Sequence, residues 1–155
     1  MTEIARSLVD RFCKVYAVRD IDKVVEFLDD DVEWTISGPV EYLRFCGTHR
    51  GKDNVIDLLR HQIPAVLRTF SFVPESILVD GNQLAMLHRQ SSRRTIDNRV
   101  INFRVANFIR FRNGKVMQNL SLLDSFDAVE QVMGHRIEFS AAGHRAADTG
   151  DLAVI

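Results

Sequence analysis

The chain has 155 residues, of which 46% are hydrophobic and 26% are charged, and its formal net charge is −1. This length fits one domain with a buried core, and the near-neutral charge gives no support for binding to nucleic acid or to a membrane surface. No apolar run approaches the ~20 residues that a membrane span requires, and the N-terminal segment lacks the apolar core of a secretory signal. We therefore expect a cytoplasmic protein.

Helical periodicity marks two segments at the start of the chain. Apolar residues recur at helical spacing over residues 3–17 and, over a shorter span, over residues 21–28. Residues 32–36 then alternate like a half-buried strand that carries Trp34, the single tryptophan. A loop is expected over residues 40–51.

A third helix is predicted over residues 52–63, and Pro64 should end or kink it. The remaining chain alternates in the manner of strands, with Asn113-Gly114 as the strongest hairpin signal. The predicted strands are 70–73, 76–80, 83–94, 99–112 and 116–124, followed by a helix over 126–134.

Helices followed by a meander of long strands predict an α+β domain over residues 1–134. Three N-terminal helices should cover one face of a strongly curved antiparallel sheet, and such a cone leaves a cavity between the two layers. No structure is assigned to the C-terminal tail, residues 135–155.

Two cysteines, Cys13 and Cys46, form neither a CxxC motif nor a disulfide framework, so we expect reduced thiols packed as small apolar groups. The histidines show no metal-ligand spacing with one another, with cysteines or with acids. The sequence therefore predicts no metal and no other cofactor.

Three motifs in this order resemble the nuclear transport factor two-like superfamily, which includes ketosteroid isomerases, SnoaL-like polyketide cyclases and limonene-epoxide hydrolases. They are RFCKVYAVRDIDKVVEFLDDDVEWT (11–35), GTHRGKDNVIDLL (47–59) and NFIRFRNGKVMQNLSLLD (107–124). The resemblance implies a cone-shaped, cystatin-like fold. It does not fix an activity, because this fold carries many chemistries and also non-enzymes.

The resemblance also places the ketosteroid isomerase groups on this chain. The tyrosine, the carboxylate base and the oxyanion-holding acid fall on Phe12, Ile36 and Asn107. Only Asn107 could still donate a hydrogen bond, and neither of the other two side chains transfers protons. Steroid isomerisation by that mechanism is therefore not expected.

The catalytic carboxylates of the epoxide hydrolases and of the polyketide cyclases are also missing from the corresponding positions. The arginine and aspartate of the epoxide hydrolases fall on His88 and Gln90, and their last-strand aspartate falls on Ser121. The cyclase aspartate also falls on Ser121, beside Asn119. Asp124 lies three residues further on, and alternation puts it on the opposite face.

Strand alternation and the first helix select a different set of residues for the cavity wall. His88 alone among them titrates near neutral pH and is the candidate acid–base, with Asn107 or Tyr16 orienting a ligand or holding a developing oxyanion. The alternatives are a buried, hydrogen-bonded core histidine, a packed tyrosine and a satisfied buried amide. The predicted ligand-binding residues are Phe12, Tyr16, Trp34, Met86, Gln90, Asn119, Ser121 and Leu123.

The outer sheet face is expected to combine arginines with apolar residues. The arginine-rich strands are either an anion-attracting patch or a solvated face paired with acids from the first half of the chain. Leu120 and Leu122 point outward, which suggests a partner subunit and predicts a homodimer through this face.

Three functional hypotheses remain open at this point. The first is a metal-independent isomerase, cyclase or hydratase that acts on a small hydrophobic or aromatic molecule with His88 as acid–base. The second is a non-catalytic ligand-binding or accessory domain. The third is a protein-partner module that uses the arginine-rich sheet.

Overall fold

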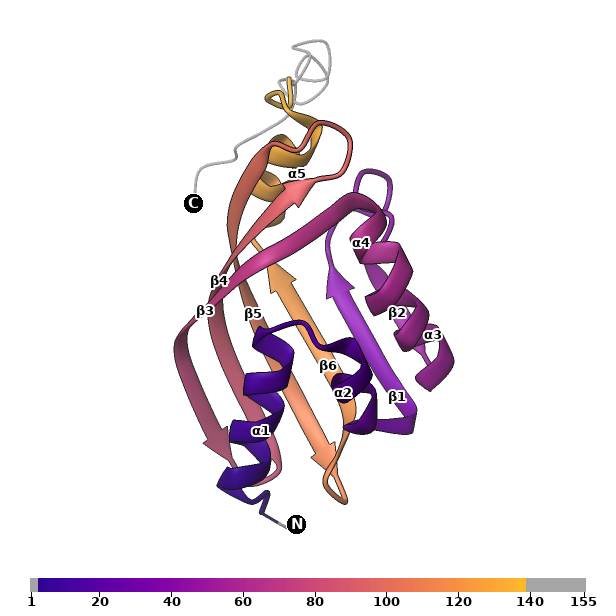
Figure 1. Cartoon of the computed structure of the whole chain (residues 1–155), viewed down its shortest axis with the longest axis vertical. Coiled ribbons are helices and arrows are strands. Elements are labelled where there is room, and N and C mark those ends of the chain that lie inside the picture. The colour runs from indigo at the N-terminus through magenta and orange to yellow at the C-terminus, as the bar shows by residue number, and fades with distance from the viewer. Residues whose placement is uncertain (1–2, 139–155) are drawn as a thin grey trace, which may run out of the picture.

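A layer of helices lies across a curved sheet in the computed structural model, which describes residues 3–138 (Figure 1). The helices are α1 (Arg6–Ala17), α2 (Ile21–Glu26), α3 (Lys52–Asp57), the π-helical turn η1 (Leu58–Gln62), α4 (Ile63–Val66) and α5 (Ser125–Met133). The strands are β1 (Leu28–Ser37), β2 (Gly47–Arg50), β3 (Leu67–Asp80), β4 (Gln83–Arg94), β5 (Val100–Arg112) and β6 (Lys115–Leu123).

The strands form one curved, open sheet in the order β2-β1-β6-β5-β4-β3. The predicted α+β fold with a cone-shaped sheet is confirmed, with one difference in the pairing. Neighbouring strands are antiparallel except for β1 and β6, which run parallel with Trp34 opposite Asn119 and Ile36 opposite Ser121. This parallel pair brings the tryptophan beside the inward side chains of the last strand.

Helix α1 packs on the sheet through Val9, Phe12, Cys13 and Tyr16, which are buried at the spacing of one helical face. The chain leaves α1 through Arg19, whose φ of 57° lies in the left-handed region that a side chain with a Cβ rarely adopts. This sharp turn starts α2 at once and holds the arginine over the concave side of the sheet.

The helix that begins at Lys52 does not stop at Pro64. It widens into the π-helical turn η1 and then continues as α4, with the proline in the first turn of that segment. A proline lacks an N–H and clashes with the preceding turn, and the wider π-helical turn relieves both problems. The helical segment therefore ends at Val66 rather than at Pro64, and β3 follows without a loop.

Two further details differ from the sequence-based expectation. The predicted loop over residues 40–51 contains the short edge strand β2, which pairs with β1. The two predicted strands 70–73 and 76–80 are one strand, β3, whose register shifts at Thr69/Ser71 and at Pro74/Ser76. Bulges of this kind keep a strand continuous where a proline cannot donate to the ladder.

Both cysteines are free and buried, as expected. Burial raises the pKa of each thiol to about 11, so the thiols are protonated at neutral pH and pack as small apolar groups. Within residues 3–138, no helix is long and apolar enough to cross a membrane. Helix α5 ends at Met133, with Gly134 as its C-terminal cap, and residues 139–155 of the predicted tail lie outside the described residues.

Candidate functional site

A small cavity lies between the helical layer and the concave face of the sheet. Its volume is about 40 Å³, which is room for roughly one water molecule. Side chains from every layer converge on it: Tyr16, Arg19, Trp34, Ile36, Phe45, Leu59, Ile63, Leu67, His88, Gln90, Phe103, Val105, Ser121 and Leu123. We call this space the inner cavity.

The inner cavity brings together only part of the residue set expected from the sequence. Tyr16, Trp34, His88, Gln90, Ser121 and Leu123 line it. The other residues of that set, Phe12, Met86, Asn107 and Asn119, are buried in the core and are not part of the cavity wall. Strand alternation therefore gave the correct inward face, while the cavity occupies one end of that face.

His88 lies on β4 with 0% of its surface exposed. The ring of Phe72 stacks on the imidazole, and neither ring nitrogen has a hydrogen-bond partner in the described part of the chain. Burial lowers the pKa of His88 to about 3, and the charge of Arg19 adds to the lowering, while Gln90 offsets a small part. The imidazole is therefore neutral at neutral pH, with one donor and one acceptor that a ligand could use.

Arg19 reaches the inner cavity from the turn after α1 and is not among the residues predicted for the cavity wall. Its Nη2 donates a 2.8 Å hydrogen bond to Oε1 of Gln90. Its guanidinium lies 4.6 Å from the ring centroid of Tyr16 and 5.5 Å from that of Phe72. The Gln90 amide is held in turn by Thr69 and Ser92, at 2.9 and 3.2 Å, so the acceptor for Arg19 is fixed.

A buried polar cluster lies beneath the inner cavity. Nδ2 of Asn107 donates to Oδ1 of Asn119 at 3.0 Å and to Oγ of Ser121 at 2.7 Å. Asn119 also donates to Ser121, at 2.9 Å. Both amide hydrogens of Asn107 are thus engaged, and this residue reaches the cavity only through the Ser121 hydroxyl.

A second hollow, which we call the outer groove, adjoins the inner cavity. Its volume is about 210 Å³, and it shares Arg19, Leu59, Ile63 and Leu67 with the inner cavity. Arg68 and Thr69 also line it. Arg19 is the one polar residue among the four shared residues.

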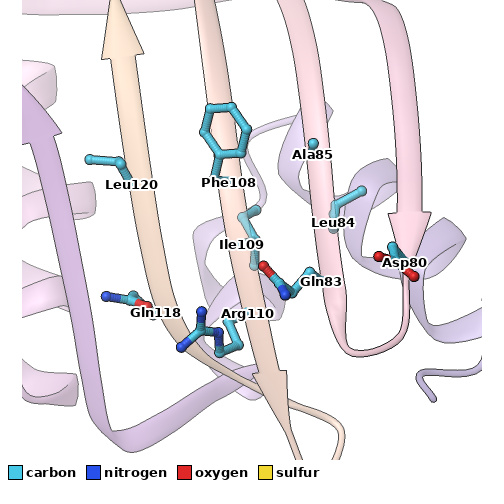
Figure 2. Close-up of a pocket in the computed structure, with 9 residues that line it drawn as sticks. All are labelled: Asp80, Gln83, Leu84, Ala85, Phe108, Ile109, Arg110, Gln118 and Leu120. Atoms are coloured by element: carbon cyan, nitrogen blue, oxygen red, sulfur yellow. The ribbon is translucent and has the colours of Figure 1, made fainter.

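The opposite face of the sheet carries a separate hollow of about 360 Å³. Figure 2 shows Phe108 and Leu120 projecting beside it, with Arg110, Gln118 and Gln83 at its polar end. Phe108 is 50% exposed, and the outward leucines of this face are exposed as well. We call this surface the outer sheet face.

The arginines of strands β4 and β5 are largely paired with acids. Arg89 and Arg104 both bind Glu75, at 3.0 and 3.1 Å. Arg112 binds Asp29, and the Arg112 guanidinium holds the pKa of that carboxyl below its ordinary value. The second interpretation of the arginine-rich strands, a solvated face paired with acids, therefore fits these contacts better than an open anion patch.

A family model relates this chain to SnoaL-like proteins, and a solved structure shares its fold. A sequence model of the SnoaL-like domain matches residues 9–119. A solved structure from Rhodopseudomonas palustris, provisionally described as an isomerase, is 31% identical and superposes with a TM-score of 0.73; the match covers 87% of this chain and 100% of that one. The resemblance expected from the three sequence motifs is confirmed.

More distant structures share the fold. A nuclear transport factor two-like protein of unknown function from Burkholderia pseudomallei is 21% identical, with a TM-score of 0.72 over 81% of this chain and 95% of that one. TerC, co-crystallised with polyporic acid, is 16% identical, with a TM-score of 0.68 over 82% of this chain and 96% of that one. A search of curated proteins gave no match.

Proposed function

Because this chain belongs to the SnoaL-like domain family, we propose that it binds a small, largely apolar or aromatic compound in the inner cavity. The observation that carries the proposal is His88, a fully buried imidazole in the cavity wall. Its two nitrogens make no hydrogen bond of normal geometry to the described residues, and Gln90 is the one polar side chain close enough to raise its pKa. Buried polar atoms are nearly always hydrogen-bonded. A ligand that binds in this cavity would supply the hydrogen bonds that the His88 ring nitrogens lack. The TerC complex supports the idea that this fold accommodates an organic compound.

The size of the inner cavity requires a rearrangement on binding. A volume of about 40 Å³ does not hold an aromatic ring, whereas the outer groove of about 210 Å³ lies directly beside it. Arg19 is the polar member of the four residues that line both spaces. Within residues 3–138 it is held by one hydrogen bond and two ring contacts and by no ion pair. We propose that the ligand enters from the outer groove as Arg19 moves aside.

The reaction we propose is isomerase-type proton transfer, which requires a bound ligand to raise the pKa of His88 from about 3, because so weak a base removes a proton from carbon poorly. In the proposed step, neutral His88 takes a proton from a carbon next to a carbonyl group, the electron pair moves to the carbonyl oxygen, and the imidazolium returns the proton to a different carbon. The proton that is removed is also returned, so the reaction needs no second reactant. Negative charge on the ligand offsets Arg19, which favours the protonated imidazole when the enolate forms.

Binding without conversion is the second candidate function. It is favoured by the cavity wall itself, which contains no Asp or Glu among the described residues. The two candidates separate once a bound compound is known. His88→Gln preserves the size and polarity of the side chain but cannot transfer protons, so an enzyme should lose at least about 100-fold in turnover. Turnover unchanged by His88→Gln would eliminate the proposed chemistry.

Binding itself is tested with two variants of neighbouring residues on β6. Leu123 lines the inner cavity, whereas Leu122 points to the outer sheet face. Leu123→Phe should fill the cavity and abolish binding of phenylacetate and phenylacetamide, followed through the fluorescence of Trp34. Leu122→Phe adds the same volume outside and should leave binding intact. Equal binding by both variants would place the ligand elsewhere.

We also propose that the chain forms a homodimer through the outer sheet face. Phe108 and Leu120 expose apolar surface on adjacent strands (Figure 2), and Leu122 on β6 is exposed as well. Apolar groups that cluster on a sheet surface favour burial against a partner. Arg110 and the glutamines at the polar end of the hollow would supply hydrogen bonds at the rim of such an interface.

A further inference from the structure

Arg19 brings a positive charge to a site without a counter-charge. It is the one Lys, Arg, Asp or Glu side chain in the described wall of the inner cavity. No carboxylate forms an ion pair with it within residues 3–138. Its known partners are a neutral amide oxygen and two aromatic faces.

Arg19 is only partly buried, but one of its guanidinium nitrogens is cut off from water. Nε of Arg19 is shielded from water and has no hydrogen-bond partner in the described structure. A desolvated guanidinium N–H without an acceptor lowers stability, and buried charges in proteins are normally paired. A negatively charged oxygen of a ligand would be a suitable acceptor for this N–H.

The neighbouring groups indicate what kind of anion fits. His88, with two unpartnered nitrogens, lines the same cavity, so a ligand oxygen has a second possible donor. Tyr16, Trp34 and Phe103 supply aromatic surface around these polar groups. The outer groove through which a ligand would enter holds a second arginine, Arg68, and again no acid.

We infer that the ligand is an organic anion, in which a carboxylate or an equivalent charged oxygen on an aromatic or apolar body binds to Arg19 and His88. This inference rests on the proposed function, since it names the class of compound that the inner cavity takes. Arginine suits the role because its planar fork matches a carboxylate in two places. The aromatic body would then replace the contacts that Arg19 makes with the rings of Tyr16 and Phe72.

Calorimetric titration with phenylacetate and with its neutral counterpart phenylacetamide tests the inference. The wild-type protein should bind phenylacetate at least about tenfold more tightly than the amide, because hydrogen bonds to charged groups are the stronger ones. Arg19→Gln should bring this ratio close to one while it retains binding of the amide. Arg19→Lys keeps the charge and should retain part of the preference.

The matched control is Arg11→Gln, which removes an exposed arginine from α1 outside both hollows and should leave the ratio unchanged. Equal affinity of the wild-type protein for the two compounds would overturn the inference and leave the proposed function standing. Binding of neither compound would contradict both. A preference for phenylacetate that survives in Arg19→Gln would overturn the assignment to Arg19.

Discussion

The ring of Phe72 lies stacked on the imidazole of His88, with the centroids 3.8 Å apart and the planes inclined by 25°. The two residues come from adjacent antiparallel strands, where Phe72 pairs with Gln90, one inward position along β4 from His88. The phenyl ring therefore covers one face of the imidazole and separates it from water. This contact helps to keep the histidine neutral.

Removal of the ring should make His88 a stronger base. In Phe72→Ala the imidazole gains access to water, so its pKa should rise from about 3 toward its ordinary value of 6.5. The free energy of unfolding should fall by about 2 kcal/mol, less than for a fully buried phenylalanine. An NMR titration of the histidine ring carbons measures the first effect, and urea unfolding measures the second.

The control for this variant is Phe70→Ala on the same strand. Phe70 is exposed and its ring contacts the guanidinium of Arg93 rather than the imidazole. It should leave the pKa of His88 unchanged. A pKa that stays near 3 in Phe72→Ala would show that the phenyl ring does not control access of water to His88.

The pH dependence of stability should report the same histidine. The pKa of His88 is about 3 in the folded chain and close to 6.5 when unfolded, so between these values the unfolded chain binds a proton that the folded chain does not. Stability should therefore fall as the pH drops from 6.5, by roughly 1 kcal/mol per pH unit. His88→Gln should flatten this slope between about pH 4.5 and 6.5.

Aspartate carboxylates contribute to the pH dependence of stability at lower pH than His88 does. Hydrogen bonds and nearby cations lower the pKa of Asp20, Asp29 and Asp57, so their stabilising effect is lost only as the pH falls below the ordinary aspartate value of 3.8.

The control for His88→Gln is His135→Gln, at an exposed position, which should keep the wild-type slope of stability against pH. If His88→Gln shows the same slope of unfolding free energy against pH as the wild-type protein, the imidazole does not lose its proton on folding.

The polar cluster beneath the cavity should be sensitive to loss of its shared acceptor. Ser121→Ala removes the hydroxyl that accepts hydrogen bonds from both Asn107 and Asn119, which leaves two buried donors with fewer partners. The free energy of unfolding should fall by about 2 kcal/mol. Ser37→Ala, on the exposed side of β1, should change it by less than about 0.5 kcal/mol. Equal effects of both substitutions in urea unfolding would contradict a shared-acceptor role.

The outer sheet face should control association. Phe108→Arg places a charge at the centre of the exposed apolar surface and should shift the protein from dimer to monomer in sedimentation velocity. Val18→Arg, at a position 70% exposed beyond the end of α1, should leave the oligomeric state unchanged. A wild-type protein that sediments as a monomer at high concentration would remove the dimer proposal.

Strand alternation predicted the inward faces well because burial alternates along real strands. His88 on β4 and Ser121 on β6 lie on the concave side as expected. Arg19 escaped prediction because its place depends on a left-handed backbone turn and on contacts with Tyr16 and Gln90, which periodicity does not encode. An arginine directly between two helical patterns was the only local signal.

The sequence pattern also did not predict which strands pair with each other. The parallel contact of β1 with β6 joins segments more than 80 residues apart, and alternation is the same whichever direction a neighbour runs. The separation of Asn107 from the cavity wall has a similar cause. It follows from a hydrogen-bonded cluster that spans two strands, not from the parity of either strand.

The most direct test is a crystal structure of the protein saturated with phenylacetate. Electron density for the phenyl ring should lie in an enlarged inner cavity near Trp34, with a carboxylate oxygen about 3 Å from a ring nitrogen of His88 and with Arg19 displaced toward it. Density only on the outer sheet face, with the Phe72 ring still stacked on His88 and the cavity unchanged, would contradict the account.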